Sequence, residues 1–512
     1  MLELNQIYNT DAFEGLKQLD ENSIDAIISD PPYQLTSITK RFGKEDSAEA
    51  QYGTDGAFQR VSYGFMGKAW DILPAVETLK ECLRVLKTGS WALWLMTPRQ
   101  DSQLEFLLRL RQAGFNISFS SVEWVYASGF PKAADLSLLA DKRACREDLT
   151  QKLGREPTKE EFKEVWDKWR ITTGYDKHRS KERNDYSKDN FEWENKDIPT
   201  SQEAQALSGS YAGMQLKPAR ELIIVSQKPI AGKTYLDQAL LHLKEPEHNQ
   251  LGGTWLDGVK IPYHSDKDKE IANSLGNSFS GKSFNTGCYH FNVGNSFVRN
   301  EYNADTTKGR FPANIIVSDN ALDIGMNKIS KLVDGSRLPP TGKNSIYGNY
   351  NRLDNIRGYD DSGDLSRYFD LDFWFENKLK ELPEEQQKIF PFLYVPKASK
   401  SERNKGLEHL PEKNQDIVSN QTNKETADKF GAERKAKMQN IHPTAKPIKL
   451  MSYLITLTTR ENDIVLDPFI GSGTTAISSI LLKRRFMGFE REEEYYKIAT
   501  ERIKFYQKQE VL

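Results

Sequence analysis

An apolar run that ends at two consecutive prolines most constrains how this chain can fold. Residues 24–28 are largely apolar and rich in isoleucine, and residues 29–33 read S-D-P-P-Y. Such a run predicts a buried strand. Proline cannot donate to a strand ladder and fixes φ, so this strand has to stop at Asp30. Its carboxyl end is therefore expected to present a carboxylate, a rigid turn and the ring of Tyr33.

These three groups suit a planar ring that carries an amino group. The Asp30 carboxylate and the Pro31 carbonyl can accept hydrogen bonds from the amino group, while Tyr33 stacks on the face of the ring. The plain alternative is an exposed acid beside a Pro-Pro turn. Residues 30–33 alone leave both interpretations open.

Composition predicts a globular, cytoplasmic protein of several domains. The chain has 512 residues, of which 38% are hydrophobic, and this length corresponds to about two to four domains. No stretch approaches the roughly 18 apolar residues of a membrane helix, and residues 1–5 lack the features of a signal peptide. Cys82, Cys145 and Cys288 are far apart, which predicts neither disulfides nor a metal site. The net charge of -2 means that nucleic-acid binding would need local basic patches.

Strand and helix patterns divide the chain into three regions. Residues 1–130 and 436–512 alternate strands with single helices, which predicts a mostly parallel sheet covered on both faces. Residues 131–435 contain long polar stretches in which basic and aromatic side chains interleave, a mixture that suits phosphate contacts and base stacking or ordinary surface insertions. The interleaved clusters lie at residues 177–186, 299–302 and 347–359.

Local signals predict the elements of the first region. A helix is expected to begin near Pro74 and end at Gly89, followed by an apolar strand over residues 91–96. A second helix is expected to end at Gly114, with one or two strands over residues 115–126.

A glycine-rich turn near the C-terminus predicts a site for a small anionic or zwitterionic cofactor. Residues 467–475 read D-P-F-I-G-S-G-T-T between a short apolar strand and a helix. Gly471 and Gly473 let the backbone approach a ligand at the helix N-terminus. The missing lysine excludes a P-loop, and the missing third glycine excludes a dinucleotide fingerprint. Glu490 ends the next strand, where an acid commonly bonds ribose hydroxyls.

The helix after this turn is expected to have a threonine cap, supplied by Thr474 or Thr475. A plain strand–helix turn is the alternative interpretation of residues 471–475 taken alone.

Together these motifs resemble amino-directed, S-adenosylmethionine-dependent DNA methyltransferases of the β arrangement. In that arrangement the D-P-P-Y motif comes first, target recognition lies in the middle and the cofactor motif comes last. Residues 309–314, 396–400 and 442–447 also resemble segments of bacterial and phage site-specific methyltransferases.

The resemblance implies a Rossmann-like α/β fold with a mostly parallel seven-stranded sheet and helices on both faces. Residues 1–130 would form the catalytic half and residues 436–512 the cofactor-binding half. Residues 131–435 would form a large inserted α+β or irregular target-recognition region. The strands before the two motifs would be sheet neighbours, so that their carboxyl ends open onto one crevice.

The resemblance also implies the site residues. The catalytic residues would be Asp30, Pro31, Pro32 and Tyr33. The residues that bind S-adenosylmethionine would be Asp11, His442, Thr444, Lys446, Asp467, Phe469, Gly471, Ser472, Gly473, Thr474 and Glu490. No metal is expected, because His442 has no partner at ligand spacing. Trp70, in a segment that resembles one beside the catalytic loop, is expected to line the pocket or belong to the core.

Two of these residues carry more specific expectations. Asp11 resembles the acid that bonds the adenine amino group of the cofactor. Lys446 is expected to serve the cofactor carboxylate, with a solvated loop lysine as the alternative.

The implied reaction transfers a methyl group to the exocyclic N6 of an adenine flipped out of duplex DNA. Asp30 and the Pro31 carbonyl would accept the amino protons and aim the nitrogen lone pair at the methyl group, without a covalent intermediate. N4-cytosine methylation is the first alternative, although D-P-P-Y is commoner among adenine enzymes of the family. Methylation of RNA or a protein amide usually goes with N-P-P-Y. A catalytically inactive DNA-binding protein is the remaining alternative.

The implied partner is double-stranded DNA, and no membrane is involved. No nuclease motif occurs in the chain, so a restriction-modification system would need a separate cognate restriction endonuclease. Phage-encoded and orphan roles are the alternatives. Because dimers are common in this arrangement, a homodimer is an alternative to a monomer.

Overall fold

The structure of the chain is a computed structural model. It describes residues 2–33, 71–126, 134–169, 171–172, 197–212, 219–270, 309–318, 322, 365–390, 397–414, 437–442 and 444–510. Trp70 and the basic and aromatic clusters at 177–186, 299–302 and 347–359 lie outside these residues.

The chain divides into two compact units. The first comprises Met1–Ser128, Ala219–Gln415 and Lys437–Leu512, and the second comprises Gly129–Pro218 and Asp416–Ala436. Residues 219–415, which the sequence grouped with the middle region, thus lie in the first unit.

One eight-stranded sheet organises the first unit. Its strands, in spatial order, are β1 (Gln6–Tyr8), β14 (Arg485–Phe489), β13 (Ile464–Asp467), β2 (Ile24–Ser29), β3 (Leu86–Met96), β9 (Arg220–Gln227), β4 (Val122–Tyr126) and β10 (Ile315–Ser318). All neighbouring strands are parallel except at β9, which is antiparallel to both β3 and β4. The predicted mostly parallel α/β sheet is confirmed. The expected seven strands are corrected to eight among the described residues, because β10 pairs with the outer side of β4.

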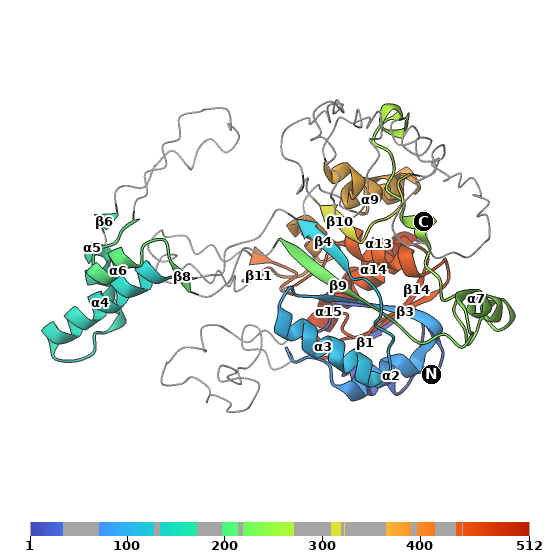
Figure 1. Ribbon diagram of the computed structural model, residues 1–512, viewed down its shortest axis with the longest axis horizontal. Coiled ribbons are helices and arrows are strands. Elements are labelled where there is room, and N and C mark those ends of the chain that lie inside the picture. Colours follow the sequence, from blue (N-terminus) through green and yellow to red (C-terminus); the bar gives the residue numbers. More distant parts are fainter. Residues whose placement is uncertain are drawn as a thin grey trace, which may run out of the picture. The chain divides into compact units, whose positions relative to one another are not determined.

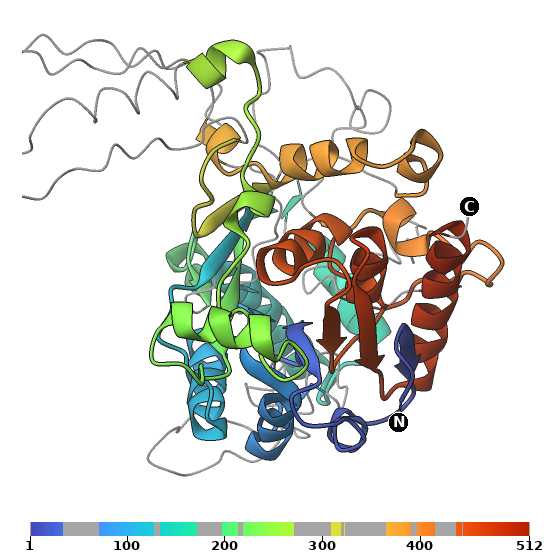
Figure 2. The ribbon, with the colours of Figure 1, turned by 90° about the vertical axis from the view of Figure 1, so that its right-hand side faces the viewer.

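The strands that precede the two sequence motifs lie side by side. β2 pairs with β13 in parallel, with Ala26 opposite Val465 and Ile27 opposite Leu466, as predicted. From β2 the chain continues to β3 on one side, and from β13 it continues to β14 on the other. This divergence is the topological switch point at which open α/β sheets bind ligands. In Figure 2 the blue strand β1 lies among the red C-terminal segments, so both ends of the chain build this half of the sheet.

Helices cover both faces of the sheet (Figure 1). One face carries α1 (Ala12–Leu16), α2 (Val76–Val85) and α3 (Gln100–Ala113). The other face carries α9 (Leu371–Lys380), α13 (Ile448–Thr458), α14 (Thr474–Leu481) and α15 (Glu493–Glu510). Shorter or peripheral elements of this unit are α7 (Tyr235–Lys244), η4 (Leu256–Val259), η7 (Leu365–Tyr368), α10 (Glu384–Gln387), α11 (Lys400–Asn404), β11 (Lys413–Asn414) and β12 (Lys437–Met438).

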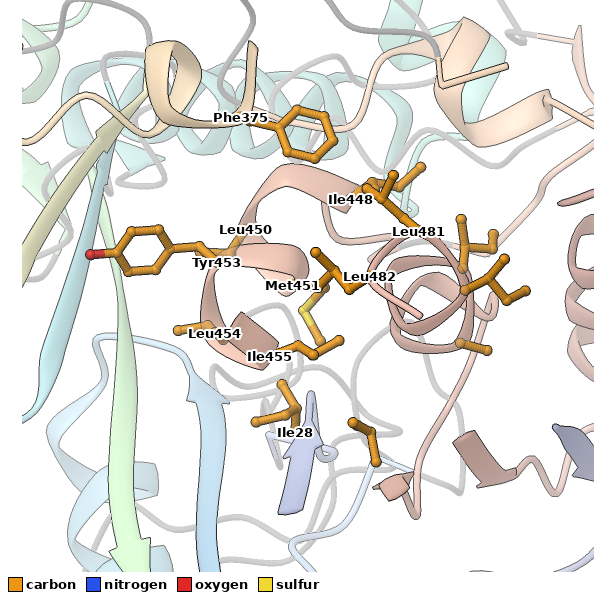
Figure 3. Packing of buried hydrophobic residues seen from close by; sticks show 14 of the residues in the cluster. Ile28, Phe375, Ile448, Leu450, Met451, Tyr453, Leu454, Ile455, Leu481 and Leu482 are labelled. Carbon is orange, nitrogen blue, oxygen red and sulfur yellow. The ribbon is translucent and has the colours of Figure 1, made fainter. Parts of the chain in front are cut away.

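Alternation along β2 divides the core into two clusters. Ile27 packs with residues of α2 and α3, whereas Ile28 packs with residues of α13 and α14. Figure 3 shows Ile28 below α13, near Ile455, and Phe375 of α9 above this helix. Burial of both faces explains why β2 is buried along its whole length.

One local prediction in the first region is corrected. The helix α2 ends at Val85, because Leu86 is already extended and pairs with Ile24 of β2. Gly89 therefore lies inside β3, where it has a φ of 81°. Residues 115–126 form only one named strand, β4. The predicted end of α3 at Gly114 is confirmed, with this glycine in the left-handed conformation.

The second unit is mainly helical. It contains β5 (Ala134–Asp135), α4 (Leu136–Leu153), α5 (Lys159–Trp169), β6 (Ile171–Thr172), β7 (Asp197–Ile198), α6 (Gln202–Ala206) and β8 (Tyr211–Ala212). Cys145 and Leu149 of α4 pack against Phe162 of α5. The buried Asp141 accepts hydrogen bonds from the backbone of Thr200 and Ser201, which fixes the entry to α6. A role in target recognition stays a prediction.

Among the residues that the structure describes, every helix is too short or too polar to cross a bilayer.

Candidate active site

One pocket of about 370 Å³ opens at the carboxyl ends of β2 and β13. Every predicted site residue except Gly473 lines it. The structure thus brings together two motifs that lie more than four hundred residues apart in the chain. The site residues themselves come from the loops that follow β1, β2, β13 and β14, and from the segment that precedes α13.

A direct hydrogen bond joins the two motifs. The Ser29 hydroxyl donates to Asp467 Oδ1 at 2.6 Å, and the Thr475 hydroxyl donates to Asp467 Oδ2 at 2.6 Å. The Phe469 amide also donates to Asp467 Oδ1. Burial raises the pKa of Asp467 to about 6, although these three donors oppose the shift. Asp467 thus ties the end of β2 to the glycine-rich turn.

The catalytic loop after β2 is held by its own polar groups. Tyr33 donates its hydroxyl proton to Asp30 Oδ1, and the Tyr33 amide donates to Asp71 Oδ1 at 2.9 Å. Asp71 is buried, so it anchors the loop to the interior of the protein. Burial raises the pKa of Asp30 to about 6, against the opposing influence of Lys446 and Tyr33. Near neutral pH most Asp30 side chains are therefore ionised acceptors.

Lys446 lies beside Asp30. Its Nζ lies 3.2 Å from Asp30 Oδ2 and 2.8 Å from Glu221 Oε2, and it donates to the Tyr33 hydroxyl at 2.8 Å. Burial opposes the charged form of Lys446, but Asp30 and Glu221 outweigh this and raise its pKa well above the usual value. The ammonium group is thus engaged with the catalytic loop, and its predicted role toward a cofactor carboxylate stays a prediction.

The glycine-rich turn needs both of its glycines. Gly471 has a φ of 53°, and a Cβ there would lie 2.7 Å from His442 Nε2. Gly473 has a φ of 82°, and a Cβ there would lie 3.2 Å from the Cβ of Ala499 in α15. Gly471 is therefore required where the turn meets the pocket, and Gly473 where it meets the helix behind.

The predicted threonine cap is wrong. Gly473 is the N-cap of α14 and supplies no side-chain bond. Thr475 bonds Asp467 instead, and the Thr474 hydroxyl is buried without a hydrogen-bond partner among the described residues. The N-terminus of α14 therefore lies at the pocket, beside a hydroxyl that has no partner in the described part of the chain.

Glu490 ends β14 at the rim of the pocket. Its two carboxylate oxygens accept hydrogen bonds from the amides of Gly471 and Glu492, at 3.0 and 2.8 Å. Asn9 supports the backbone here by donating to the Glu490 carbonyl at 2.8 Å. Burial raises the pKa of Glu490 to about 7, against the influence of the two amides. Asp11, the N-cap of α1, lies at the same rim and accepts from the Phe13 amide.

Two arginines, the partly buried Arg403 and the buried Arg502, hold the loops around the pocket. Arg403 of α11 donates to the His442 carbonyl, and Arg502 of α15 donates to the Ser472 carbonyl. Burial, followed by the charges of Arg403, Arg502 and Lys446, lowers the pKa of His442 to about 3. His442 is therefore a neutral imidazole at physiological pH, and its Nδ1 is buried without a partner among the described residues.

Sequence reasoning missed Ser29, Glu221, Arg403 and Arg502. Glu221 directly precedes the apolar run at residues 222–225, at the amino end of a strand, so the carboxyl-end rule that selected Asp30 does not find it. Arg502 interrupts an apolar stripe of α15 formed by Ala499, Ile503 and Tyr506. A charged residue on such a stripe is a signal for a buried polar contact.

The pocket suits a cofactor with several polar groups. Thr474 Oγ1 and His442 Nδ1 are buried polar atoms without partners in the described part of the chain, and Gly471 leaves space for a close approach. Glu490 offers a carboxylate at the end of the neighbouring strand, as nucleoside sites commonly do. Within the described residues, no three His, Cys, Asp or Glu side chains gather as metal ligands would.

Fold and site together define a Rossmann-like α/β protein with a ligand pocket at the switch point of its sheet. The sequence model of the DNA methylase family matches residues 343–501, which is about a third of the chain. The match includes His442, Asp467 and Glu490, whereas residues 30–33 lie outside it.

Curated relatives match over a short segment. The chain is 50% identical over 62 residues to the type II methyltransferase M2.DpnII of Streptococcus pneumoniae, which is 12% of this chain and 23% of the relative. It is 48% identical over 62 residues to the type II methyltransferase M.HindIII of Haemophilus influenzae, which is 12% of this chain and 20% of the relative. The chain thus spans less than a quarter of the length of these relatives.

Solved structures align over most of the chain but with low similarity. The cytosine-N4-specific PvuII DNA methyltransferase has a TM-score of 0.34 and 11% identity, covering 99% of this chain and 91% of that one. The M1.HpyAVI–SAM complex has a TM-score of 0.30 and 13% identity, covering 97% and 98%. At these scores neither structure bears on the site.

Proposed function

We propose that this protein transfers a methyl group from S-adenosylmethionine to the N6 amino group of an adenine in duplex DNA. The observation that carries the proposal is that the D-P-P-Y loop and the glycine-rich turn line one and the same pocket. The strands before them are joined by the hydrogen bond from Ser29 to Asp467. The match of residues 343–501 to the DNA methylase family supports the same reading.

Residues around the glycine-rich turn would hold the cofactor. Glu490 would accept from the ribose hydroxyls, and the unsatisfied Thr474 hydroxyl and His442 imidazole would meet its other polar groups. The cofactor supplies an electrophilic methyl group when bound. Asp11 and Phe469 line the same space and would contact the adenosine end.

Residues of the catalytic loop would hold the target base. Asp30 Oδ1 now accepts the Tyr33 hydroxyl, so an amino group that binds Asp30 displaces this hydroxyl and frees the ring to stack on the base. The Pro31 carbonyl accepts the second amino proton. These bonds aim the nitrogen lone pair, and positioning is the main catalytic contribution. Because an amino group inside a duplex cannot reach the pocket, the base leaves the helix.

A methyl-transfer assay with base identification tests this proposal. Purified protein is incubated with tritium-labelled S-adenosylmethionine and DNA from a methylation-free bacterial host, and the nucleosides are separated by mass spectrometry. N6-methyladenine is the expected product. If N4-methylcytosine forms instead, the target base is cytosine and not adenine. Cofactor binding without methyl transfer would favour an inactive DNA-binding protein.

The Asp30→Ala variant tests the assigned chemistry. It should abolish transfer and leave cofactor affinity within about twofold, because the carboxylate contacts the base side of the pocket. Glu14→Ala removes an exposed carboxylate of α1 as a control. Activity retained by Asp30→Ala would remove Asp30 from the mechanism.

The proposal extends to partners and location. Since the relatives are named type II methyltransferases, a separate cognate restriction endonuclease is the proposed biological counterpart. A DNA substrate and the isolated, buried Cys82 and Cys145 fit a cytoplasmic location. A homodimer is the proposed assembly, and light scattering during size-exclusion chromatography would separate it from a monomer.

A further inference from the structure

Lys446 joins two acidic side chains that come from different strands. Asp30 follows β2, whereas Glu221 lies near the start of the antiparallel strand β9. Lys446 Nζ lies 3.2 Å from Asp30 Oδ2 and 2.8 Å from Glu221 Oε2. The three side chains are only 10–16% exposed, so their charges act on one another with little screening.

We infer that Glu221 is a positioning residue for methyl transfer: it holds Lys446 beside Asp30 and keeps the group of three side chains negatively charged. This inference rests on the proposed function, because it deepens the role of the same pocket. Glu221 acts through Lys446 and does not contact the target base.

The net charge of Asp30, Lys446 and Glu221 explains how Glu221 would favour methyl transfer. The charges of Lys446 and Asp30 alone would cancel. With Glu221 included, two carboxylates and one ammonium group leave one net negative charge. The amino nitrogen becomes positive while it accepts the methyl group, until its proton leaves. A fixed negative charge beside it favours that change. Lys446 without Glu221 would oppose the change by placing an uncompensated ammonium group near the nitrogen.

Neighbouring side chains orient the Glu221 carboxylate. Glu221 Oε1 accepts the Tyr126 hydroxyl at 3.3 Å, and Lys397 lies 5.1 Å from the centre of the Tyr126 ring. Among the described residues, the charged or titratable groups around Asp30 are therefore Lys446 and Tyr33 in direct contact, with Glu221 behind Lys446 and Tyr126 behind Glu221. Glu221 raises the pKa of Asp30 through its charge. This influence provides a readout that a merely structural side chain would not have.

The test compares Glu221→Gln with a matched control. Glutamine keeps the size of the side chain and an oxygen for Lys446, but it removes the charge. Glu123→Gln removes a carboxylate from the neighbouring strand β4, where Glu123 pairs with Arg220 at 2.8 Å. Glu221→Asp keeps the charge and should recover part of the activity.

Methyl transfer to DNA and cofactor affinity are measured from pH 5 to 9. Glu221→Gln is expected to lower kcat roughly tenfold to a hundredfold, the scale of a misplaced catalytic group. Its cofactor affinity should stay unchanged, and the acidic limb of its kcat profile should move to lower pH. Glu123→Gln should behave as the wild type.

A second readout does not depend on activity. Carbon-13 NMR of labelled aspartate, with the Asp30 signal assigned from Asp30→Asn, should show that Glu221→Gln lowers the pKa of Asp30. An unchanged kcat profile and an unchanged Asp30 titration in an active enzyme would overturn the role of Glu221 alone. A wild type that binds cofactor and transfers no methyl group would overturn the proposed function, and the positioning role with it.

Discussion

Ser29 and Asp467 are joined by a 2.6 Å hydrogen bond although 438 positions separate them in the chain. The bond closes the switch point of the sheet, because Ser29 ends β2 and Asp467 ends β13. It sets the spacing between the D-P-P-Y loop and the glycine-rich turn. One hydroxyl and one buried carboxylate thus link the two halves of the pocket.

Removing this hydroxyl should destabilise the protein. Ser29→Ala leaves the buried Asp467 carboxylate short of a donor, which costs about 1–3 kcal/mol. The pKa of Asp467 is raised to about 6 in the folded protein, so the carboxyl group is protonated at pH 4.5 and ionised at pH 7.5. The loss should therefore be larger at pH 7.5. Urea unfolding at the two pH values measures it.

Ser23→Ala, just before the other end of β2, is the control for this experiment. The Ser23 hydroxyl donates to the Asp20 carbonyl and lies away from the pocket. Equal unfolding free energies for Ser29→Ala and the wild type at pH 7.5 would show that the Ser29–Asp467 hydrogen bond does not stabilise the folded protein.

Alanine substitutions at the two glycines of the turn should differ in their effect on cofactor binding while both lower stability. Gly471→Ala and Gly473→Ala both force an alanine into the left-handed region, at a cost of about 1–2 kcal/mol. The methyl group of Gly471→Ala also meets His442, inside the pocket. It should weaken S-adenosylmethionine binding about tenfold or more, which corresponds to 1.4 kcal/mol or more. Titration calorimetry with thermal unfolding distinguishes the two effects, and equal affinities for both variants would contradict this division.

Strand ends could be predicted from the sequence because proline and glycine leave local signals. The prolines after Asp30 and the glycines after Asp467 mark where β2 and β13 stop, and parallel strands bring such ends to one edge. The prediction for Gly89 was wrong although glycine also leaves a local signal there. It looked like a helix terminator, but pairing of Leu86 with Ile24 starts β3 before the glycine is reached.

The supporting contacts could not be predicted because they join elements that the sequence keeps apart. Glu221 reaches the pocket only because β9 runs antiparallel between β3 and β4. Nothing local to residues 220–227 indicates this order. Arg502 meets the Ser472 carbonyl because α15 packs against α14, a packing choice set by the core as a whole.

Cofactor affinity should depend on pH through Glu490. Burial raises the pKa of this carboxyl group to about 7, so it is protonated below that value and loses strength as an acceptor for ribose hydroxyls. The dissociation constant of S-adenosylmethionine should therefore rise as the pH falls from 8 to 6. Glu490→Gln should bind more weakly at pH 8 and show little change over this range. A pH-independent wild type, measured by calorimetry, would contradict the assignment of Glu490 to the ribose.

Lys446 and Glu221 should shift the activity profile in opposite directions. Lys446 lowers the pKa of Asp30 through its charge and its hydrogen bond, so Lys446→Met should raise that pKa above about 6. Because Asp30 accepts the amino protons only when ionised, the acidic limb of kcat should move to higher pH. In Glu221→Gln it should move to lower pH. Methyl transfer measured against pH for both single variants and the double variant provides the comparison. The two residues touch, so their effects should be non-additive. Shifts in the same direction would mean that Asp30 does not control the limb.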